Sequence, residues 1–593
     1  MSKKIIFSKI LPNNYNGFYT NYLSTSRNEI DLNFIDISKH AIESEKIWVT
    51  QLDEWHSKLS KIIQNKTWIW WLMPGSRITT LGYPYNLKPL FFSLGVIDYL
   101  EKNIYSDFFI IGLPHEASEY IKEWNSKLEE NKKYIIYDNI NKNINFNLKK
   151  YKYIISSFKY FILLFFNSLF HSNKNKDKID LMVFSIMLNP NSISIDGDHY
   201  FGKIFEEKKI QNYNKIDWFY LSTRFKYIKK AFYNSKNVNR DISFNFNWLS
   251  ILDFIKILNI LIKSKMDFIT VNKELPNLKI NNFDSSLFTK NFFEQTVMNY
   301  IPVKEVALYI ASKNYIIFKK PKTLIYPYEQ KPIERALLQA CVDSHLSIKT
   351  IAYAHAIYNN GHRYIFNFKN LFKPYPNILA TTGPASTKWF VNIIGWDIKK
   401  IVCLGSPRFN NIKINNNDQL FSNKLKILLL ISFPYELENM SKWCESNSSL
   451  FDNCELMIRV HPYAWYREQE YAICRIKKMG IQIIDSTRTL NDEINWANLC
   501  LFCSTSAGIE AMLNNKLVIR VGLDDFFNIN PLVDKDGGSD IMSASDPLQL
   551  KYLINHVIKM NISEINRIKE IQYFFAKQIY SNFSIDTVMN LLN

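Results

Sequence analysis

The segment at residues 456–521 constrains the fold of this chain most, because short apolar strands and helical runs alternate along it. The first strand, LMIRVHP, ends at His461 and Pro462, since proline cannot continue a hydrogen-bonded ladder. The next apolar run, NLCLFC, leads into the helix GIEAMLNN and then the strand KLVIRV. Four small residues open that helix: Ser504, Thr505, Ser506 and Gly508. The alternation predicts an α/β unit with a parallel sheet.

The same residues suit an anion. Hydroxyl groups and unpaired backbone N–H groups at the start of a helix face an incoming phosphate, and the helix dipole favours negative charge there. In an open α/β sheet ligands bind outside the carboxyl ends of the strands, so His461 and the hydroxyl turn at 504–506 are expected to face one crevice. Taken singly, a His-Pro is usually a turn and a Ser-Thr-Ser is usually a helix cap. Their joint occurrence favours a pocket for a nucleotide mono- or diphosphate.

A strand-terminal His-Pro, a hydroxyl-rich turn and an acidic residue one helical turn later, Glu510, resemble the C-terminal half of GT-B glycosyltransferases of bacterial surface polysaccharides. The order is most similar to the groups that use CMP-activated acidic sugars, namely sialyltransferases, polysialyltransferases and Kdo transferases. The resemblance covers residues 322–521 and implies an α/β GT-B fold, with two Rossmann-like domains facing a cleft. It also implies that His461 beside Pro462, and the hydroxyl turn with Gly508, hold the donor phosphate. Glu510 is then expected at the ribose or the cytosine.

The length of 593 residues exceeds what one hydrophobic core usually organises, so at least two domains are expected. We predict an N-terminal, acceptor-side Rossmann-like domain over residues 1–410, with strands at TWIWWLM, DFFIIGLP and KYIIYD and a helical, basic insertion at about 141–285. A nucleotide-sugar-binding Rossmann-like domain is expected at 424–545. Residues 546–593 are expected to form terminal helices that cross back to the first domain.

An inverting transfer needs a base that accepts the acceptor's hydroxyl proton, across the cleft from the donor phosphate and therefore in the N-terminal half. Asp196 in IDGDHYFG is the first candidate, because sialyltransferases of the resembled type carry an acidic-acidic-glycine motif whose aspartate is the base; this chain has Ile195 at the first acidic position. His355 in IAYAHAIYNNG is the second, since it resembles the catalytic histidine of teichoic-acid glycerophosphotransferases. Glu329 in YPYE, at a strand end, is the third. The alternative for each is a loop residue without chemistry.

The string DGD that begins at Asp196 also matches the DxD metal motif of GT-A glycosyltransferases. Three-residue matches arise by chance, however, and a GT-A domain leaves the His461 segment unexplained. A CMP donor has one phosphate and needs a divalent ion less, so we expect no metal and no cofactor besides the nucleotide-sugar donor. Arg408 and Arg459 lie near strand ends and are expected to pair with a phosphate or a sugar carboxylate, or to form an interdomain salt bridge.

The net charge of +18, from 73 Lys and Arg against 55 Asp and Glu, favours polyanions or anionic membrane surfaces. The sequence has no recognisable nucleic-acid-binding motif, so nucleic acid is not expected as a partner. The most hydrophobic stretch, residues 153–170, lies among lysines, and residues 224–236 and 248–265 repeat this basic amphipathic character. These segments are either interfacial helices with snorkelling lysines or core helices of a large domain. The first alternative suits a lipid-linked acceptor.

The seven cysteines are scattered and odd in number, and the N-terminal sequence has no long apolar run with a cleavage site. We therefore expect a cytoplasmic protein, with possible peripheral contact to the inner face of a bacterial plasma membrane. Cys500 and Cys503 form a single CxxC, but residues three apart in a strand point to opposite faces. That geometry favours buried core thiols over a metal or redox site.

The resemblance and the motifs together predict an inverting GT-B glycosyltransferase of surface carbohydrate synthesis. It would transfer an acidic eight- or nine-carbon sugar from a CMP donor to a glycan or lipid-linked glycan. Two alternatives stay open at this point. One is a teichoic-type CDP-polyol phosphotransferase, and the other is a non-catalytic, membrane-associated scaffold of a capsule complex, which would not bind CMP.

Overall fold

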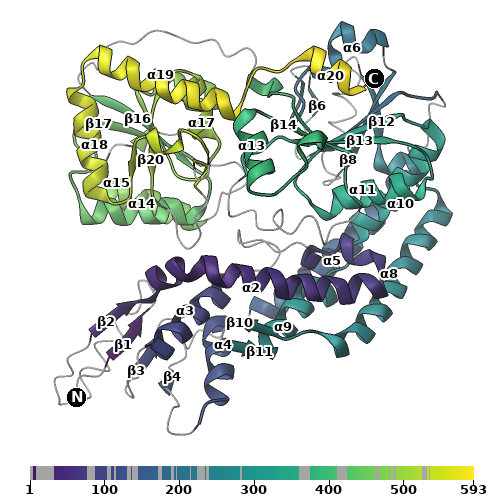
Figure 1. Ribbon diagram of the computed structural model, residues 1–593, viewed down its shortest axis with the longest axis horizontal. Coiled ribbons are helices and arrows are strands. Elements are labelled where there is room, and N and C mark those ends of the chain that lie inside the picture. Colours follow the sequence, from purple (N-terminus) through teal and green to yellow (C-terminus); the bar gives the residue numbers. More distant parts are fainter. Residues whose placement is uncertain are drawn as a thin grey trace.

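The computed structural model describes most of the 593 residues. The described parts are residues 4–7, 33–76, 87–102, 108–111, 115–129, 135–136, 145–170, 177–187, 193–194, 197–213, 215–222, 234, 240–280, 283–358, 374–409, 424–460, 467–479, 481, 483–484, 489–523, 530–532 and 535–592. Two α/β units lie side by side, and an N-terminal region lies below them in the view of Figure 1. The 30-residue helix α2 (Ile37–Lys66) runs along that region.

The first unit is built on a seven-stranded sheet in which all strands are parallel, in the order β15-β14-β13-β12-β5-β8-β9. The strands are β5 (Leu181–Met187), β8 (Ile216–Ser222), β9 (Asp241–Phe244), β12 (Thr323–Pro327), β13 (Lys349–Ala354), β14 (Ile378–Thr381) and β15 (Ile401–Cys403). The helices that follow or connect them include α10 (Val303–Lys319), α11 (Pro332–Asp343) and α13 (Pro384–Asn392). Every residue of β5 and β12 is buried, as expected for central parallel strands covered on both faces.

The second unit contains a six-stranded parallel sheet in the order β18-β17-β16-β19-β20-β21. Its strands are β16 (Leu425–Ile431), β17 (Cys454–Val460), β18 (Ile483–Ile484), β19 (Leu499–Phe502), β20 (Leu517–Val521) and β21 (Ser543–Ala544). Its helices are α14 (Pro434–Ser446), α15 (Arg467–Lys478), α16 (Leu490–Trp496), α17 (Ala507–Leu513) and α18 (Pro547–Lys559). Two successive parallel α/β units confirm the predicted α/β class with two Rossmann-like halves, the GT-B arrangement.

The two cysteines of the CxxC lie on opposite faces of this second sheet. Cys500 is buried in one hydrophobic core and Cys503 in the other, so the prediction of core thiols is confirmed. Burial raises the pKa of Cys500 to about 12, which keeps this thiol protonated at neutral pH.

The N-terminal region differs from its prediction in two ways. The segment TWIWWLM, expected to be a strand, forms the 3-10 helix η1 (Trp68–Leu72). Its last four residues are all buried, so the apolar run reflects burial on several sides and not the period of a strand. The expected strands β3 (Phe108–Ile111) and β4 (Ile135–Ile136) exist, but they pair in a separate parallel sheet, β2-β1-β3-β4. This small sheet is completed by β1 (Lys4–Phe7) and β2 (Asn33–Asp36), and the helices α3 (Lys88–Lys102) and α4 (His115–Ser126) accompany it.

The stretch at about 141–285, predicted to be a helical insertion, is only partly helical. It contains α5 (Asn145–Phe170), α6 (Lys208–Tyr213) and α8 (Ile251–Val271), but also β5, β8 and β9, three of the seven strands of the main sheet. The prediction assigned the short apolar run LMVFSIM, which forms β5, to the helical insertion because it follows a long lysine-rich helix. Of the basic segment 224–236, only residue 234 is among the described residues.

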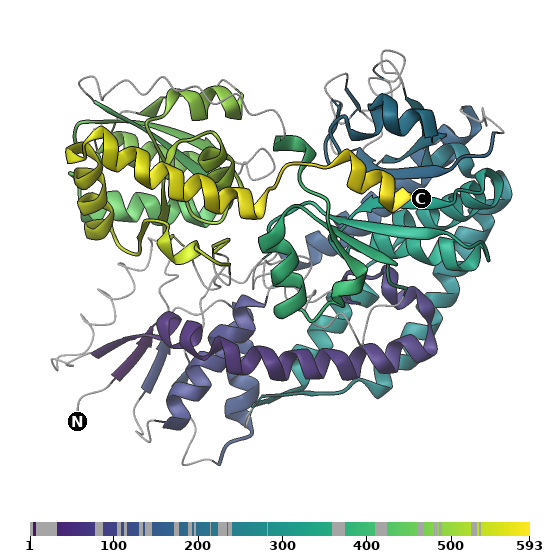
Figure 2. The same ribbon diagram turned by 45° about the horizontal axis from the view of Figure 1, so that its top comes forward.

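The C-terminal chain touches both α/β units. Helix α19 (Ile562–Ile579) lies over the second unit, and the chain then passes to α20 (Ile585–Leu592) beside the first unit (Figure 2). The connection is hydrogen-bonded to the first unit, since the Ser406 N–H donates to the Ser581 carbonyl at 2.9 Å. A Cβ on Gly405, which has φ +84°, would lie 2.3 Å from the Asn582 carbonyl oxygen. The close approach of these two chain segments therefore requires glycine at position 405.

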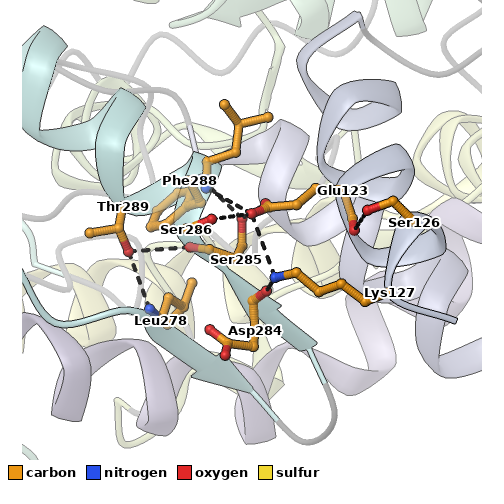
Figure 3. A network of polar contacts seen from close by, with 10 residues as sticks. Glu123, Ser126, Lys127, Leu278, Asp284, Ser285, Ser286, Phe288 and Thr289 are labelled. Atoms are coloured by element: carbon orange, nitrogen blue, oxygen red, sulfur yellow. Dashed lines mark hydrogen bonds and ion pairs between the residues drawn. The ribbon is translucent and has the colours of Figure 1, made fainter.

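A polar network ties the N-terminal region to the hairpin of β10 (Leu278–Ile280) and β11 (Phe283–Ser285). Figure 3 shows Glu123 of α4 at the start of α9 (Ser286–Phe293). Its carboxylate accepts from the Ser285 hydroxyl at 2.6 Å and from the Leu287 N–H at 3.0 Å, and an acceptor there satisfies the free N–H groups of the helix end. The contact has a structural purpose, because it anchors α4 on α9.

Candidate active site

The order of strands in the first unit marks where a ligand would bind. The chain builds β5, β8 and β9 towards one edge and later β12, β13, β14 and β15 towards the other, so the direction reverses between β5 and β12. Ligands of open α/β sheets bind at such a reversal, beyond the carboxyl ends of the strands. Glu329 follows β12, His355 follows the neighbouring β13, and the loop with Asp196 comes after β5. Glu329 and His355 thus belong to the loops around one switch point.

Glu329 sits in a turn that a second carboxylate holds in place. The N–H groups of Glu329 and Gln330 both donate to the buried Glu334 at 2.8–3.0 Å, at the start of α11. Gln330 adopts a positive φ of 53°, which completes the turn. The Glu329 carboxylate contacts the Lys331 ammonium and the His355 ring, whose Nε2 lies 3.5 Å from Oε1.

His355 is a largely buried imidazole with an unusual environment. Its ring packs edge-to-face on Tyr200 with the centroids 4.7 Å apart, and Nδ1 is buried without a hydrogen-bond partner within the described residues. Burial lowers the pKa of His355 to about 4; Glu329 opposes the shift, while the cations Lys331 and Arg408 add to it. The ring is therefore neutral at neutral pH and retains a lone pair that can accept a proton.

Of the two aspartates in the DGD string, only Asp198 is described. Asp196 lies outside the described residues. Asp198 is buried in the hairpin of β6 (Ile193–Ser194) and β7 (Gly197–Asp198), and both of its oxygens are occupied by protein donors. It accepts from Ser185 Oγ at 2.7 Å, Tyr220 Oη at 3.0 Å, Tyr200 N at 2.8 Å and Phe201 N at 3.1 Å. Asp198 therefore fixes the loop that carries Tyr200 to His355, and its lone pairs are directed at protein and not at a metal.

The second unit has its own switch point. Its chain builds β16, β17 and β18 towards one edge and then β19, β20 and β21 towards the other, so the reversal lies between β16 and β19. Ser504 follows β19, and its hydroxyl donates to Glu436 of α14. The other oxygen of Glu436 accepts the N–H groups of Ser432 and Phe433 at 2.7 and 3.2 Å. The hydroxyl of Ser504, the first in the predicted phosphate-binding turn, thus already donates a hydrogen bond to a buried carboxylate.

The remaining residues of the turn have different roles. Thr505 Oγ1 accepts the N–H of Ala507 at 3.2 Å, whereas Ser506 is exposed and makes no helix-capping bond. Gly508 is buried, and a Cβ there would lie 2.3 Å from the Phe502 ring. The packing of α17 on β19 therefore explains the glycine at this position. Of the three hydroxyl groups in the turn, that of Ser506 is the most accessible to a ligand.

Two of the predicted binding residues connect the units. Arg408, in the loop after β15, reaches Glu510 of α17 with its Nη2 3.9 Å from Oε1. Burial raises the pKa of Glu510, and the positive charges of Arg408 and Arg459 oppose that shift. Arg459, at the end of β17, is itself held by the buried Glu493 at 2.6 Å. The positive charge of Arg408 also lowers the pKa of His355, so this arginine acts on a candidate group in each unit.

His461 and Pro462 directly follow β17 and lie outside the described residues, so their predicted donor contacts stay predictions. The structure adds members that the sequence did not reveal: Tyr200 against His355, Lys331 against Glu329, and Tyr580 against Phe409, the neighbour of Arg408. Lys331 has a sequence signal, since it stands two residues after Glu329. Tyr580 has none, because the C-terminal chain brings it there from the far end of the sequence. Within the described residues, no group of three metal-ligating side chains is placed to hold an ion.

No protein-family model and no curated protein matches this sequence. Among solved structures, the chain is similar to the UDP-GlcNAc 2-epimerase from Neisseria meningitidis bound to UDP-GlcNAc, with a TM-score of 0.41 and 9% identity over 70% of this chain and 98% of that one. It is also similar to MurG from Acinetobacter baumannii, with a TM-score of 0.38 and 10% identity over 70% and 99%. The lipopolysaccharide outer core galactosyltransferase WaaB, apo form, gives 0.37 and 10% over 70% and 99%. Likenesses at these scores assign neither an activity nor a substrate.

Proposed function

We propose that the protein is a glycosyltransferase that takes a sugar from a nucleotide donor and joins it to a hydroxyl of a glycan. The observation that carries the proposal is the line of groups between the two units. His355 and Glu329 lie at strand ends of the first unit, Glu510 lies in the first turn of α17 in the second, and Arg408 extends from the first unit to Glu510. A base on one side and an anion-binding edge on the other are what a transfer between two bound substrates needs.

In this mechanism the acceptor oxygen attacks the anomeric carbon while the bond from that carbon to the donor phosphate breaks. The hydroxyl proton passes to the neutral His355, and Glu329 at 3.5 Å stabilises the imidazolium that forms, as a positioning residue. The leaving nucleotide keeps the bonding electron pair, and Arg408 together with Arg459 offsets its negative charge. A single displacement inverts the anomeric configuration. Asp196 is the alternative base.

We further propose a CMP-linked acidic sugar as the donor and a surface glycan, free or lipid-linked, as the acceptor. The resemblance of the residues around His461 supports this choice, as does the guanidinium group of Arg408 beside Glu510. Arg408 is 41% exposed and paired only at 3.9 Å, which leaves it available to a sugar carboxylate. No divalent ion is required to offset the single phosphate of CMP.

A second candidate is the transfer of a polyol phosphate from a CDP-polyol. The Lys331 ammonium beside the His355 and Glu329 pair favours it, because a phosphoryl group in transfer spreads negative charge next to the base. In that reaction the acceptor oxygen attacks the β-phosphorus, the proton again passes to His355, and CMP leaves. The product gains a polyol phosphate instead of a sugar, so its mass separates the two reactions.

Thermal stability in the presence of CMP, CDP, UDP and GDP tests the donor class. Selective stabilisation of the wild type by CMP, lost in His461→Ala and kept in His556→Ala on the exposed face of α18, supports the CMP-sugar donor. A preference for UDP or GDP discards the CMP donor and retains a nucleotide-sugar transferase. Silence from all four nucleotides contradicts catalysis and favours the scaffold. With the selected donor, the mass of the product then identifies the transferred group.

A further inference from the structure

Helices α5 and α8 expose an unusual amount of apolar surface. Twelve large hydrophobic side chains on them are between 37% and 67% exposed. They are Ile155, Phe158, Ile162, Phe166 and Leu169 on α5, and Ile251, Leu252, Ile255, Leu258, Ile262, Met266 and Ile269 on α8. Their spacing of mostly three or four residues makes one stripe along each helix. Soluble monomers rarely expose contiguous apolar patches larger than a few hundred Å², and side chains of this number and size exceed that.

The two stripes lie on the same side of the molecule. The Ser157 hydroxyl of α5 donates to Ile301 O just before α10, and Asn314 near the end of α10 donates to Asp253 at the start of α8. The two helices meet where Phe165 packs on Phe254, with the ring centroids 5.1 Å apart. Helix α5 therefore runs in the same direction as α10. Helix α8 runs in the opposite direction, antiparallel to both. On each helix the exposed stripe lies about a quarter turn around the helix axis from the phenylalanine that contacts the other helix. Because the two helices are antiparallel, this rotation places both stripes on the same outer side of the pair.

Lysines border this surface, which we name the α5–α8 face. The two helices carry seven lysines and two aspartates between them. Lys159 lies beside the α5 stripe on the side away from α8, and Lys256 and Lys263 lie beside the α8 stripe on the side away from α5; all three are exposed. Asp253 is buried on the side that faces α10 and pairs with Lys256 at 2.8 Å, so Lys159 and Lys263 carry the positive charge of the two edges. The face is thus apolar in the middle and positive on both edges.

We propose that the α5–α8 face rests on the surface of an anionic lipid bilayer. An apolar stripe enters the boundary between head groups and acyl chains, and flanking lysines reach the lipid phosphates; this is how amphipathic helices bind in the plane of a membrane. In the part of the chain that the structure describes, no helix is long and apolar enough to cross a bilayer. The proposal is independent of the enzymatic one, because it rests only on the shape and charge of these two helices.

A second copy of the chain is a poorer occupant for this face. Two copies joined through the α5–α8 face would bring the lysine edges of one against those of the other. Like charges placed opposite each other at an interface cost affinity, and among the described residues only Lys256 of the three bordering lysines is offset by an ion pair, to Asp253 at 2.8 Å. Anionic head groups supply the opposite charge along both edges at once.

Flotation of the full-length protein with phospholipid vesicles tests the proposal. We expect it to float with vesicles of phosphatidylethanolamine and phosphatidylglycerol, and much less with pure phosphatidylcholine vesicles. The variant Phe158→Ser with Ile262→Ser should lower the partition coefficient by at least roughly tenfold. The matched control is Leu548→Ser with Tyr552→Ser on α18, where the two side chains are 72% and 68% exposed; it should float like the wild type.

Charge is tested separately with Lys159→Glu and Lys263→Glu, against Lys559→Glu on α18 as the control. The reversal on the face should abolish the preference for anionic vesicles, and added salt should do the same to the wild type. Equal flotation of the wild type and the Phe158→Ser, Ile262→Ser variant contradicts the proposal, as does failure of the wild type to float. A wild-type dimer in light scattering that this variant dissociates, with vesicle binding unchanged, also contradicts it and makes the face a subunit interface.

Discussion

The carboxyl edges of the two sheets look alike in sequence and differ in how their polar groups are used. In the first unit His355 keeps a buried nitrogen without a hydrogen-bond partner among the described residues and a pKa of about 4. In the second unit Ser504 is bound to Glu436, Thr505 accepts a backbone N–H and Gly508 is fixed by Phe502. A polar residue at a strand end becomes available for chemistry only where the fold has not already satisfied it. The contrast therefore favours His355 as a reacting group and makes most of the hydroxyl turn a structural element.

Replacement of His355 and of Ser504, one residue from each edge, gives the largest expected difference in turnover. His355→Gln removes the proton acceptor and should lower turnover by about 10²- to 10⁴-fold, with nucleotide-induced stabilisation retained. Ser504→Ala should lower turnover less than tenfold and should instead lower the free energy of unfolding by about 1–3 kcal/mol, because Glu436 loses a buried hydrogen bond. Turnover with the selected donor and urea unfolding measure the two effects.

The outcome of Asp196→Asn completes this test. Full activity in Asp196→Asn and loss in His355→Gln assigns the base to His355, whereas the opposite pattern assigns it to Asp196. Equal losses of turnover in His355→Gln and Ser504→Ala would break the contrast between the two edges. Glu329→Gln should retain part of the activity, and its pH profile should shift, since this carboxylate only stabilises the protonated ring.

A pH series tests the second consequence of an unsatisfied buried imidazole. The folded-state pKa of His355 is lowered to about 4 from 6.5, so the unfolded chain binds the extra proton first as the pH falls. Stability is therefore full above pH 6.5 and is lost as the pH falls towards 4; this site alone contributes a loss of about 2 kcal/mol between pH 7 and pH 5. The measurement is urea unfolding at both pH values.

His56 provides the comparison within the same chain. Its pKa is also lowered to about 4 by burial, but its Nε2 is bonded to the Gly75 carbonyl at 2.9 Å, deep in the N-terminal region. Both His56→Gln and His355→Gln should flatten the pH dependence of stability by a similar amount. Only His56→Gln should also lower stability at pH 7, because it breaks a buried hydrogen bond. A steep pH dependence that survives in both variants would show that other groups dominate acid unfolding.

The difference between the edges also explains what the sequence could predict. Alternating apolar runs from residue 322 onward predicted the strands and helices of that half, because parallel strands of buried residues have a clear local signature. The sequence likewise placed Glu329, His355 and Arg408 at or near strand ends, where the structure has them. The TWIWWLM helix and the strand β5 were missed, because a short apolar run does not distinguish a buried helix from a strand. Local sequence does not show which hydroxyl will donate to a carboxylate far away in the chain, so the hydrogen bond from Ser504 to Glu436 could not be predicted.

Gly508→Ala sharpens the structural reading of the hydroxyl turn. The added methyl group would lie 2.3 Å from the Phe502 ring, which is buried and cannot move freely, so we expect a loss of about 1–3 kcal/mol in the free energy of unfolding. Ser506→Ala, two residues away on an exposed position, should change it by less than about 1 kcal/mol. Denaturant unfolding compares the two variants. A stable Gly508→Ala variant that loses nucleotide binding would instead place a ligand against the glycine.

Arg408→Met is expected to have the smallest effect on stability and the most informative effect on binding. The side chain is 41% exposed and lies 3.9 Å from Glu510, and ion pairs of this kind contribute less than about 1 kcal/mol to folding. If Arg408 serves the donor, the affinity for CMP should nevertheless fall by about tenfold, the equivalent of one charge-assisted hydrogen bond. Glu510→Gln is the matched partner variant, and calorimetric titration with CMP measures both. A loss of stability without a loss of affinity in Arg408→Met would mean that the arginine joins the two units and binds no donor. The polar groups at the edge of the first unit would then include a structural one, as those of the second unit do.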